Sequence, residues 1–199
     1  MEIILATNNQ HKVEEINLIL NFHNNKLLTL NDINFHNDII ENGSTYNENS
    51  NIKADTIFKK ITEKKIILAD DSGLEIDFLD GAPGLHSARW GGKNLPQIEK
   101  NNKILEILKD TDNRKAKFIS VVCCITPAGK TNYFKGVCEG NIIKSQKGNE
   151  GFGYDPIFIP NGFTKTFAEL SGDIKNYISH RAIAFNLVKK HLIYSGLLD

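Results

Sequence analysis

The sequence has 199 residues, of which 40% are hydrophobic and 24% charged, enough to bury a substantial core within one domain. Its 24 Lys and Arg residues balance 24 Asp and Glu residues, which argues against a broad surface for nucleic acid or an acidic membrane. The opening residues, MEIILATNN, resemble neither a signal peptide nor a membrane span, so we expect a cytoplasmic protein. The 3 cysteines lack C-x-x-C spacing, so a disulfide framework or zinc site is not expected.

Strands and helices alternate in the first half of the chain, which predicts an α/β core. Apolar residues at helical spacing indicate two helices, and short apolar runs indicate three strands. The expected elements are a strand at 2–6, a helix at 11–22, a short strand at 27–30, a helix at 49–61 and a strand at 66–69.

The third expected strand is followed by two adjacent carboxylates, in the stretch IILADDSG (66–73). Neighbouring residues of a strand point to opposite faces, so Asp70 and Asp71 can face one partner only if the strand breaks there. We expect such a break at DDSG, with extended structure resuming at Leu74–Phe78.

Glycine and proline divide the second half of the chain. The stretch DGAPGLHSARWGGK predicts a loop, and Gly148–Gly153 predicts another. The remaining elements are a helix at about 96–109, a β-hairpin of 117–126 and 132–143 around the turn PAGK, and a final helix from Ser179 to about Tyr194.

TNNQHK (Thr7–Lys12) joins the first strand to the first helix. A helix N-terminus with short polar side chains and a lysine is suited to binding a phosphate. An ordinary capped helix with a surface lysine would have the same sequence, so the pattern alone leaves both interpretations open.

Four acidic residues beside expected loops are candidate ligands of a hard cation. Mg²⁺ is typically held by one or two protein carboxylates, with phosphates and water completing its coordination. For Glu41 and Glu48 the alternative is a solvated charge, or for Glu48 a carboxylate at a helix start. For Asp70 and Asp71 it is a turn that ends the strand.

Two later motifs carry groups that suit a nucleotide base. In GFGYDP (151–156), glycines permit close approach and Phe152 or Tyr154 could stack on a base, although an aromatic-anchored turn has the same pattern. In SHRA (179–182), His180 and Arg181 lie in the first turn of the final helix, where a core or surface pair is the alternative.

Together and in this order, six blocks closely resemble the inosine triphosphate pyrophosphatase family, also called dITP/XTP pyrophosphatases. The resemblance covers nearly the whole chain. It is carried by LATNNQHK (5–12), ENGSTYNENSNIKA (41–54), ADDSGLEIDFLDGAPGLHSARW (69–90), GFGYDPIFIP (151–160), KTFAEL (165–170) and SHRA (179–182).

The resemblance implies one domain over residues 1–199, an α/β fold with an elongated mixed sheet and two lobes around a central cleft. It implies a homodimer that uses Mg²⁺ to hydrolyse a purine nucleoside triphosphate to the monophosphate and pyrophosphate. Glu41 and Asp71 would bind the metal, and Asp71 would accept the proton of the attacking water. The implied substrate-binding residues are Thr7, Asn8, Asn9, Gln10, His11, Lys12, Lys53, Ser72, Phe152, Gly153, Tyr154, Asp155, Lys175, His180 and Arg181.

Base choice follows from hydrogen bonding. Donors on His180 and Arg181 would pair with the 6-oxygen of hypoxanthine or xanthine but not with the 6-amino group of adenine. The sequence leaves the role of Asp70 and the exclusion of guanine open. Two alternative functions remain: a Maf-like pyrophosphatase acting on pyrimidine or modified nucleotides, and a nucleotide sensor that does not hydrolyse its ligand.

Overall fold

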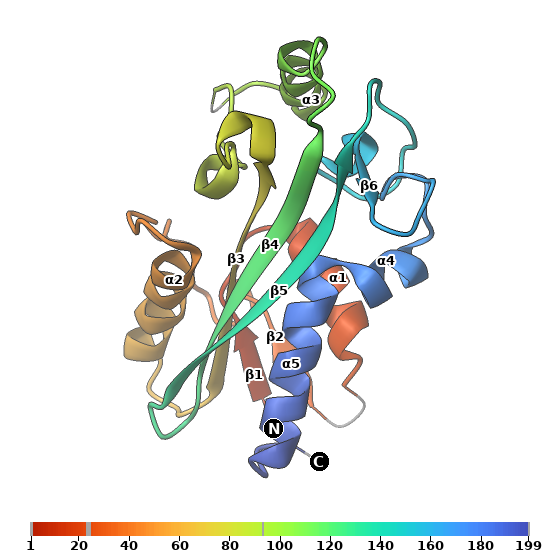
Figure 1. Ribbon diagram of the computed structural model, residues 1–199. Coiled ribbons are helices and arrows are strands. Elements are labelled where there is room, and N and C mark those ends of the chain that lie inside the picture. Colours follow the sequence, from red (N-terminus) through yellow and green to blue (C-terminus); the bar gives the residue numbers. More distant parts are fainter. Residues whose placement is uncertain (1, 23–24, 93, 199) are drawn as a thin grey trace. The chain divides into compact units, whose positions relative to one another are not determined.

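The computed structural model describes residues 2–22, 25–92 and 94–198, and within them it shows a mixed α/β fold. Its six strands form one sheet in the order β2-β1-β3-β4-β5-β6 (Figure 1). The strands are β1 (Glu2–Leu5), β2 (Lys26–Leu28), β3 (Ile66–Ile76), β4 (Lys115–Ile125), β5 (Thr131–Ile142) and β6 (Phe158–Pro160). The helices are α1 (Gln10–Leu20), α2 (Tyr46–Lys60), α3 (Gln97–Ile107), α4 (Gly172–Ile178) and α5 (His180–Tyr194). The predicted α/β class with a mixed sheet is therefore confirmed.

Most of the predicted elements are present with boundaries shifted by a few residues. The short strand β6 and helix α4 were not predicted, because neither offers more than one or two periods of a hydrophobic pattern. The predicted break at DDSG is wrong. Strand β3 continues without interruption through Asp70, Asp71, Ser72 and Gly73 to Ile76.

The chain divides into two compact units. The first contains residues 1–71, 120–136 and 181–199, and the second contains residues 72–119 and 137–180. Strands β3, β4 and β5 each contribute residues to both units.

In the first unit, β1 pairs in parallel with both β2 and β3. Leu5 lies opposite Leu68, and the Ala6 amide donates to the Leu68 carbonyl at 2.7 Å. The carboxyl end of β1 therefore lies beside Leu68, two residues before Asp70 along β3. This places the loop that enters α1 close to the acidic pair on β3.

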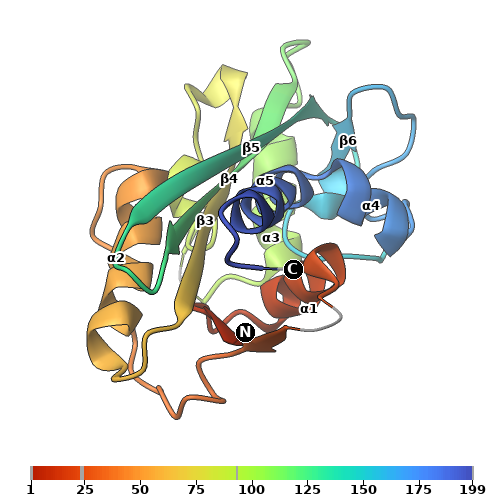
Figure 2. The same cartoon turned by 90° about the horizontal axis from the view of Figure 1, so that it is seen from below.

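The two faces of the sheet in the first unit carry separate hydrophobic cores. Ile66 and Leu68 of β3 pack in one core with residues of α1 and α5, including Ile16 and Phe185. The alternate residues Ile67 and Ala69 pack in the other core with residues of α2, including Ile57. Figure 2 shows α1 and α5 on one side of these strands and α2 on the other. Because successive side chains of β3 point to opposite faces of the sheet, alternate residues pack against different helices.

The second unit has its own core, built from β3, α3, β4, β5, β6 and the segment before α4. Phe118 packs edge-on against Phe158, with ring centroids 4.8 Å apart. None of the helices among the described residues is long and apolar enough to cross a membrane.

Candidate active site

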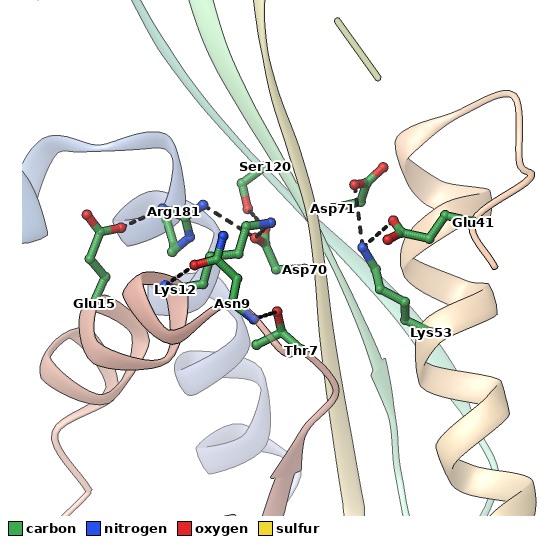
Figure 3. Close-up of polar contacts among 10 residues, drawn as sticks. All are labelled: Thr7, Asn9, Lys12, Glu15, Glu41, Lys53, Asp70, Asp71, Ser120 and Arg181. Atoms are coloured by element: carbon green, nitrogen blue, oxygen red, sulfur yellow. Dashed lines mark hydrogen bonds and ion pairs between the residues drawn. The ribbon is translucent and has the colours of Figure 1, made fainter. Parts of the chain in front are cut away.

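Asp70 and Asp71 of β3 belong to two separate charged clusters, one on each face of the strand (Figure 3). Asp70 follows Ile66 and Leu68 on the face toward α1 and α5, whereas Asp71 follows Ile67 and Ala69 on the face toward α2. The premise that adjacent residues face opposite ways is therefore correct. The conclusion that the strand must break is wrong, because each carboxylate has a cationic partner on its own side.

Asp70 is fully buried and surrounded by donors. Its Oδ2 atom lies 2.7 Å from Lys12 Nζ and 3.4 Å from Arg181 Nη2. Ser120 of β4 donates its hydroxyl proton to Asp70 Oδ1 at 2.5 Å. Three elements, α1, β4 and α5, thus supply hydrogen bonds or ion pairs to one side chain.

These partners keep Asp70 ionised. Burial alone would raise the pKa of Asp70, but the Lys12 ammonium and the Arg181 guanidinium lower it well below its usual value. With both oxygens engaged inside the protein, this carboxylate is a counterion for Lys12 and Arg181. The sequence left the role of Asp70 open, and the structure shows which side chains it contacts.

Glu15 belongs to the same cluster and was not among the predicted site residues. Arg181 Nη1 donates to Glu15 Oε2 at 2.5 Å, and the Arg181 side chain is only 2% exposed. The spacing of Lys12 and Glu15 places them on one face of α1, which is a signal that sequence reasoning could have used. For Ser120 the signal is a hydroxyl that alternates with the buried residues Val122 and Cys124 along β4.

On the other face of β3, Lys53 lies between two carboxylates. Its Nζ atom is 2.6 Å from Glu41 Oε2 and 3.5 Å from Asp71 Oδ1. Lys53 comes from α2, and Glu41 comes from the segment that precedes this helix. The structure therefore brings together the two predicted metal ligands, Glu41 and Asp71, around one cationic nitrogen.

The start of α2 holds the Glu41 segment in place. Thr45 caps the helix by accepting from the Glu48 amide at 3.1 Å, and Glu48 accepts from the Ser44 amide at 2.6 Å. The Gly43 amide donates to Asn49 Oδ1 at 2.8 Å. Two alternatives to metal binding were considered for Glu48, a solvated charge and a carboxylate at a helix start. These contacts match the second.

Asp71 differs from Asp70 in both protonation and bonding. Burial raises the pKa of Asp71 above its usual value, and although Lys53 and Lys12 oppose the rise, Asp70 and Glu41 add to it. Its Oδ2 atom is buried and has no hydrogen-bond partner among the described residues. A buried carboxylate with an open acceptor and a raised pKa is suited to bind a cation or to accept a proton.

The donor set fits Mg²⁺ only as a partial protein site. Among the described residues, no cluster of three or more His, Cys, Asp or Glu side chains could hold a metal ion. Two carboxylates that converge on one positive charge nevertheless match the one or two protein ligands that Mg²⁺ takes when phosphates and water supply the rest. The residues present therefore fit a metal that arrives with a phosphorylated ligand.

The loop Thr7–Lys12 presents polar groups at the start of α1. Asn9 caps the helix, and its Oδ1 atom accepts from the Lys12 amide at 3.2 Å. The side chains of Asn8, Gln10 and His11 are exposed, whereas Lys12 turns inward to Asp70. The capped helix is therefore present, but Lys12 is not a surface lysine, and phosphate binding by this loop stays a prediction.

In the second unit, the glycine-rich stretch forms a turn around Asp155. Asp155 Oδ2 accepts from the Phe152 amide at 2.8 Å and from Lys175 Nζ at 2.5 Å. Lys175 Nζ also lies 5.0 Å from the centre of the Phe152 ring. Gly151, at φ 72°, has no room for a side chain, because an added Cβ would lie 2.2 Å from Asp155 Oδ2.

The remaining predicted residues of the second unit have varied surroundings. Tyr154 is buried and donates its hydroxyl proton to the Ser87 carbonyl at 2.8 Å. His180 is also buried and stacks on Phe118, with ring centroids 4.8 Å apart. Ser72 is half-buried on β3, and Gly153 adopts a positive φ of 66°.

Comparison with known proteins agrees with the resemblance found in the sequence. A dITP/XTP pyrophosphatase of Clostridium perfringens is 45% identical over 96% of this chain and 97% of its own length. One from Christiangramia forsetii is 43% identical over 96% of this chain and 99% of its own length. The solved structure of the Staphylococcus aureus Ham1 protein has a TM-score of 0.88 at 37% identity and covers 98% of this chain and 100% of that one.

The match to the family as a whole extends over residues 3–191, which include both charged clusters of β3 and the Asp155 turn. Sequence, fold and comparison therefore lead to one assignment. This chain belongs to the Ham1 family.

Proposed function

We propose that this chain hydrolyses noncanonical purine nucleoside triphosphates, namely ITP, dITP and XTP, to the monophosphate and pyrophosphate. The observation that carries the proposal is the open, buried carboxylate of Asp71 beside Lys53 and Glu41. Family membership supports the substrate class, since full-length relatives bear the name dITP/XTP pyrophosphatase. Removal of such nucleotides would cleanse the nucleotide pool.

Glu41 and Asp71 would hold Mg²⁺ in this proposal. When bound, the ion would neutralise negative charge on the triphosphate and polarise a phosphoryl oxygen. Lys53, which contacts both carboxylates, would add a second positive charge beside the phosphates. This arrangement resembles other phosphoryl-transfer sites, in which positioning and charge neutralisation account for most of the catalysis.

Asp71 would accept the proton of the water that attacks the α-phosphorus. A general base is most effective when its pKa lies near the working pH, and burial moves the pKa of Asp71 in that direction. The ionised Asp70 on the opposite face would keep its fixed partners and take no proton. The two neighbours therefore would have separate roles.

The loop Thr7–Lys12 would bind the triphosphate. The positive end of the α1 dipole and the exposed side chains of Asn8, Gln10 and His11 offer interactions for phosphate oxygens. Lys12 would contribute a full charge while Asp70 holds its ammonium group in place.

For the purine, Phe152 is better suited than Tyr154 to stack on the base, because the Tyr154 ring is buried in the core. Lys175 and Asp155 would fix the Phe152 turn. His180 and Arg181 would supply donors for the 6-oxygen, which adenine lacks. Ser72 and Gly153 complete the proposed substrate residues. The position of the substrate between two lobes stays a prediction.

A product screen across nucleoside triphosphates with Mg²⁺ tests the proposal. We expect pyrophosphate, not orthophosphate, from ITP, dITP and XTP, with ATP and GTP poor substrates. Preferred hydrolysis of dTTP or UTP would support the Maf-like alternative instead. Binding of ITP without product would support the sensor, and equal turnover of ATP would contradict the argument from the 6-oxygen.

We also propose a homodimer in the cytoplasm, as the family resemblance implies. Light scattering on the purified chain tests the dimer, with a mass twice the 22.3 kDa of one chain as the expected result. Immunolocalisation tests the compartment.

A further inference from the structure

The Arg181 guanidinium is held from two sides by two carboxylates. Its Nη1 atom donates to Glu15 Oε2 at 2.5 Å, and its Nη2 atom lies 3.4 Å from Asp70 Oδ2. Glu15 comes from α1 and Asp70 from β3. Figure 3 shows the guanidinium between these two side chains.

The charges of this cluster balance only when Glu15 is included. Lys12 and Arg181 carry two positive charges, and both approach the same oxygen, Asp70 Oδ2. Without Glu15, two largely buried cations would share one carboxylate, which is an expensive arrangement in a medium of low polarity. Lys12 lies closer to Asp70, at 2.7 Å, than Arg181 does, so Glu15 supplies the shorter ion pair of Arg181.

Two contacts also fix the orientation of the guanidinium. The group is planar, with donors in a rigid fork, so acceptors on Nη1 and Nη2 define both its plane and its rotation. The contact with Glu15, at 2.5 Å, is shorter than the contact with Asp70, at 3.4 Å, so Glu15 holds its side of the fork more closely.

We propose that Glu15 is a positioning residue for purine recognition, which acts through Arg181 and touches neither the phosphates nor the attacking water. The inference rests on the proposed function, in which Arg181 donates to the 6-oxygen of the base. Because the base is bound alike before and during phosphoryl transfer, loss of this positioning raises KM and leaves kcat nearly unchanged.

Steady-state kinetics of Glu15→Gln with ITP and ATP test the inference. We expect KM for ITP to rise about tenfold with kcat within about twofold, so that the preference for ITP over ATP falls about tenfold. The matched control is Glu14→Gln on the same helix, which is exposed and keeps an acceptor for its hydrogen bond from Gln10. This control should retain wild-type KM, kcat and preference.

A double-mutant cycle links the effect to Arg181. In an Arg181→Lys background, Glu15→Gln should change KM by less than about twofold, because the fork that it positions is gone. If Glu15→Gln does not fold, Glu15→Asp replaces it, since the shorter carboxylate keeps the charge but loses reach. The expected direction is the same.

The outcomes separate the two levels of the argument. Failure of the wild-type chain to cleave ITP would overturn the proposed function together with this inference. Wild-type cleavage of ITP with an unchanged KM and ITP preference in Glu15→Gln would overturn the inference alone. A fall in kcat or in melting temperature with KM unchanged would likewise overturn it, because it would indicate a structural role.

Discussion

The two carboxylates on β3 are chemically identical neighbours, yet their surroundings give them opposite properties. Asp70 has both oxygens engaged, by Lys12, Arg181 and Ser120, and its pKa is lowered. Asp71 has one contact with Lys53 at 3.5 Å, an open Oδ2 atom and a raised pKa. Both side chains are largely buried, so burial does not explain the difference between their pKa shifts. The number of hydrogen-bond and ion-pair partners does.

This difference indicates how a protein can assign structure and chemistry to adjacent residues. A saturated carboxylate resists protonation and holds its neighbours in position, whereas an unsaturated one retains the capacity to bind or accept a proton. The following predictions test this division, beginning with the largest effect.

The largest effect should come from Asp71→Asn. Loss of the general base should lower kcat/KM for ITP by about 10³-fold, which is about 4 kcal/mol in the activation barrier. The free energy of unfolding at pH 7 should not fall, since the carboxylate removed is one that burial disfavours. Pyrophosphate release and urea denaturation measure the two quantities. Asp77→Asn, at an exposed position, is the control.

Asp70→Asn, unlike Asp71→Asn, should lower the free energy of unfolding. It would leave the Lys12 and Arg181 charges with one carboxylate fewer, and breaking a buried pair in this way costs about 3 kcal/mol of unfolding free energy. Urea denaturation beside Asp71→Asn checks the prediction. Equal stability of the two variants would contradict the division between them.

Lys53→Gln should make the free energy of unfolding depend more strongly on Mg²⁺ than it does in wild type. Without Lys53, the carboxylates of Glu41 and Asp71 lose their shared cation, so the variant should be less stable than wild type in EDTA. Saturating Mg²⁺ should then restore about 1 kcal/mol of its unfolding free energy, more than it adds to wild type. Thermal melting with and without the ion measures this. Lys60→Gln, exposed on the same helix, should show no such difference.

The smallest effect should be the dependence of stability on pH. Asp71 has a raised pKa in the folded chain, so it binds more protons there and its contribution to stability falls as pH rises through the window above its usual pKa. Asp71→Asn should therefore gain stability relative to wild type as pH rises above the usual pKa of aspartate. Asp70 has a lowered pKa, so wild type gains stability as pH rises toward the usual pKa of aspartate, and Asp70→Asn should lose stability relative to wild type over that more acid window. Urea denaturation at several pH values checks both signs.

The sequence alone was sufficient to predict the alternation of strands and helices and the α/β class, because hydrophobic periodicity encodes both. It could not predict the course of β3 at DDSG. Asp, Ser and Gly are poor strand formers locally, but the paired strands and the cations at Lys12 and Lys53 override that preference. Knowledge of those partners requires contacts between residues far apart in the chain.

The candidate site was predictable to the extent that its motifs are local. Glu41, Lys53 and Asp71 were predicted and lie together in the structure. Glu15 was missed because its partner in the ion pair, Arg181, lies 166 positions away along the chain. Charge pairs of this kind leave no local pattern beyond the shared helix face with Lys12.

The uninterrupted course of β3 has a consequence for altering this protein. The hydrogen-bonded backbone of the sheet separates the groups around Asp70 from those around Asp71. Substitutions near Glu41 can therefore alter the surroundings of Asp71 while the geometry around Asp70 is kept. A residue inserted ahead of Asp70 would affect both groups, because it would move each following side chain to the other face of the sheet. Asp70 and Asp71 would then each face the cations that now contact the other. The number of residues in β3 ahead of Asp70 is therefore constrained together with the two carboxylates themselves.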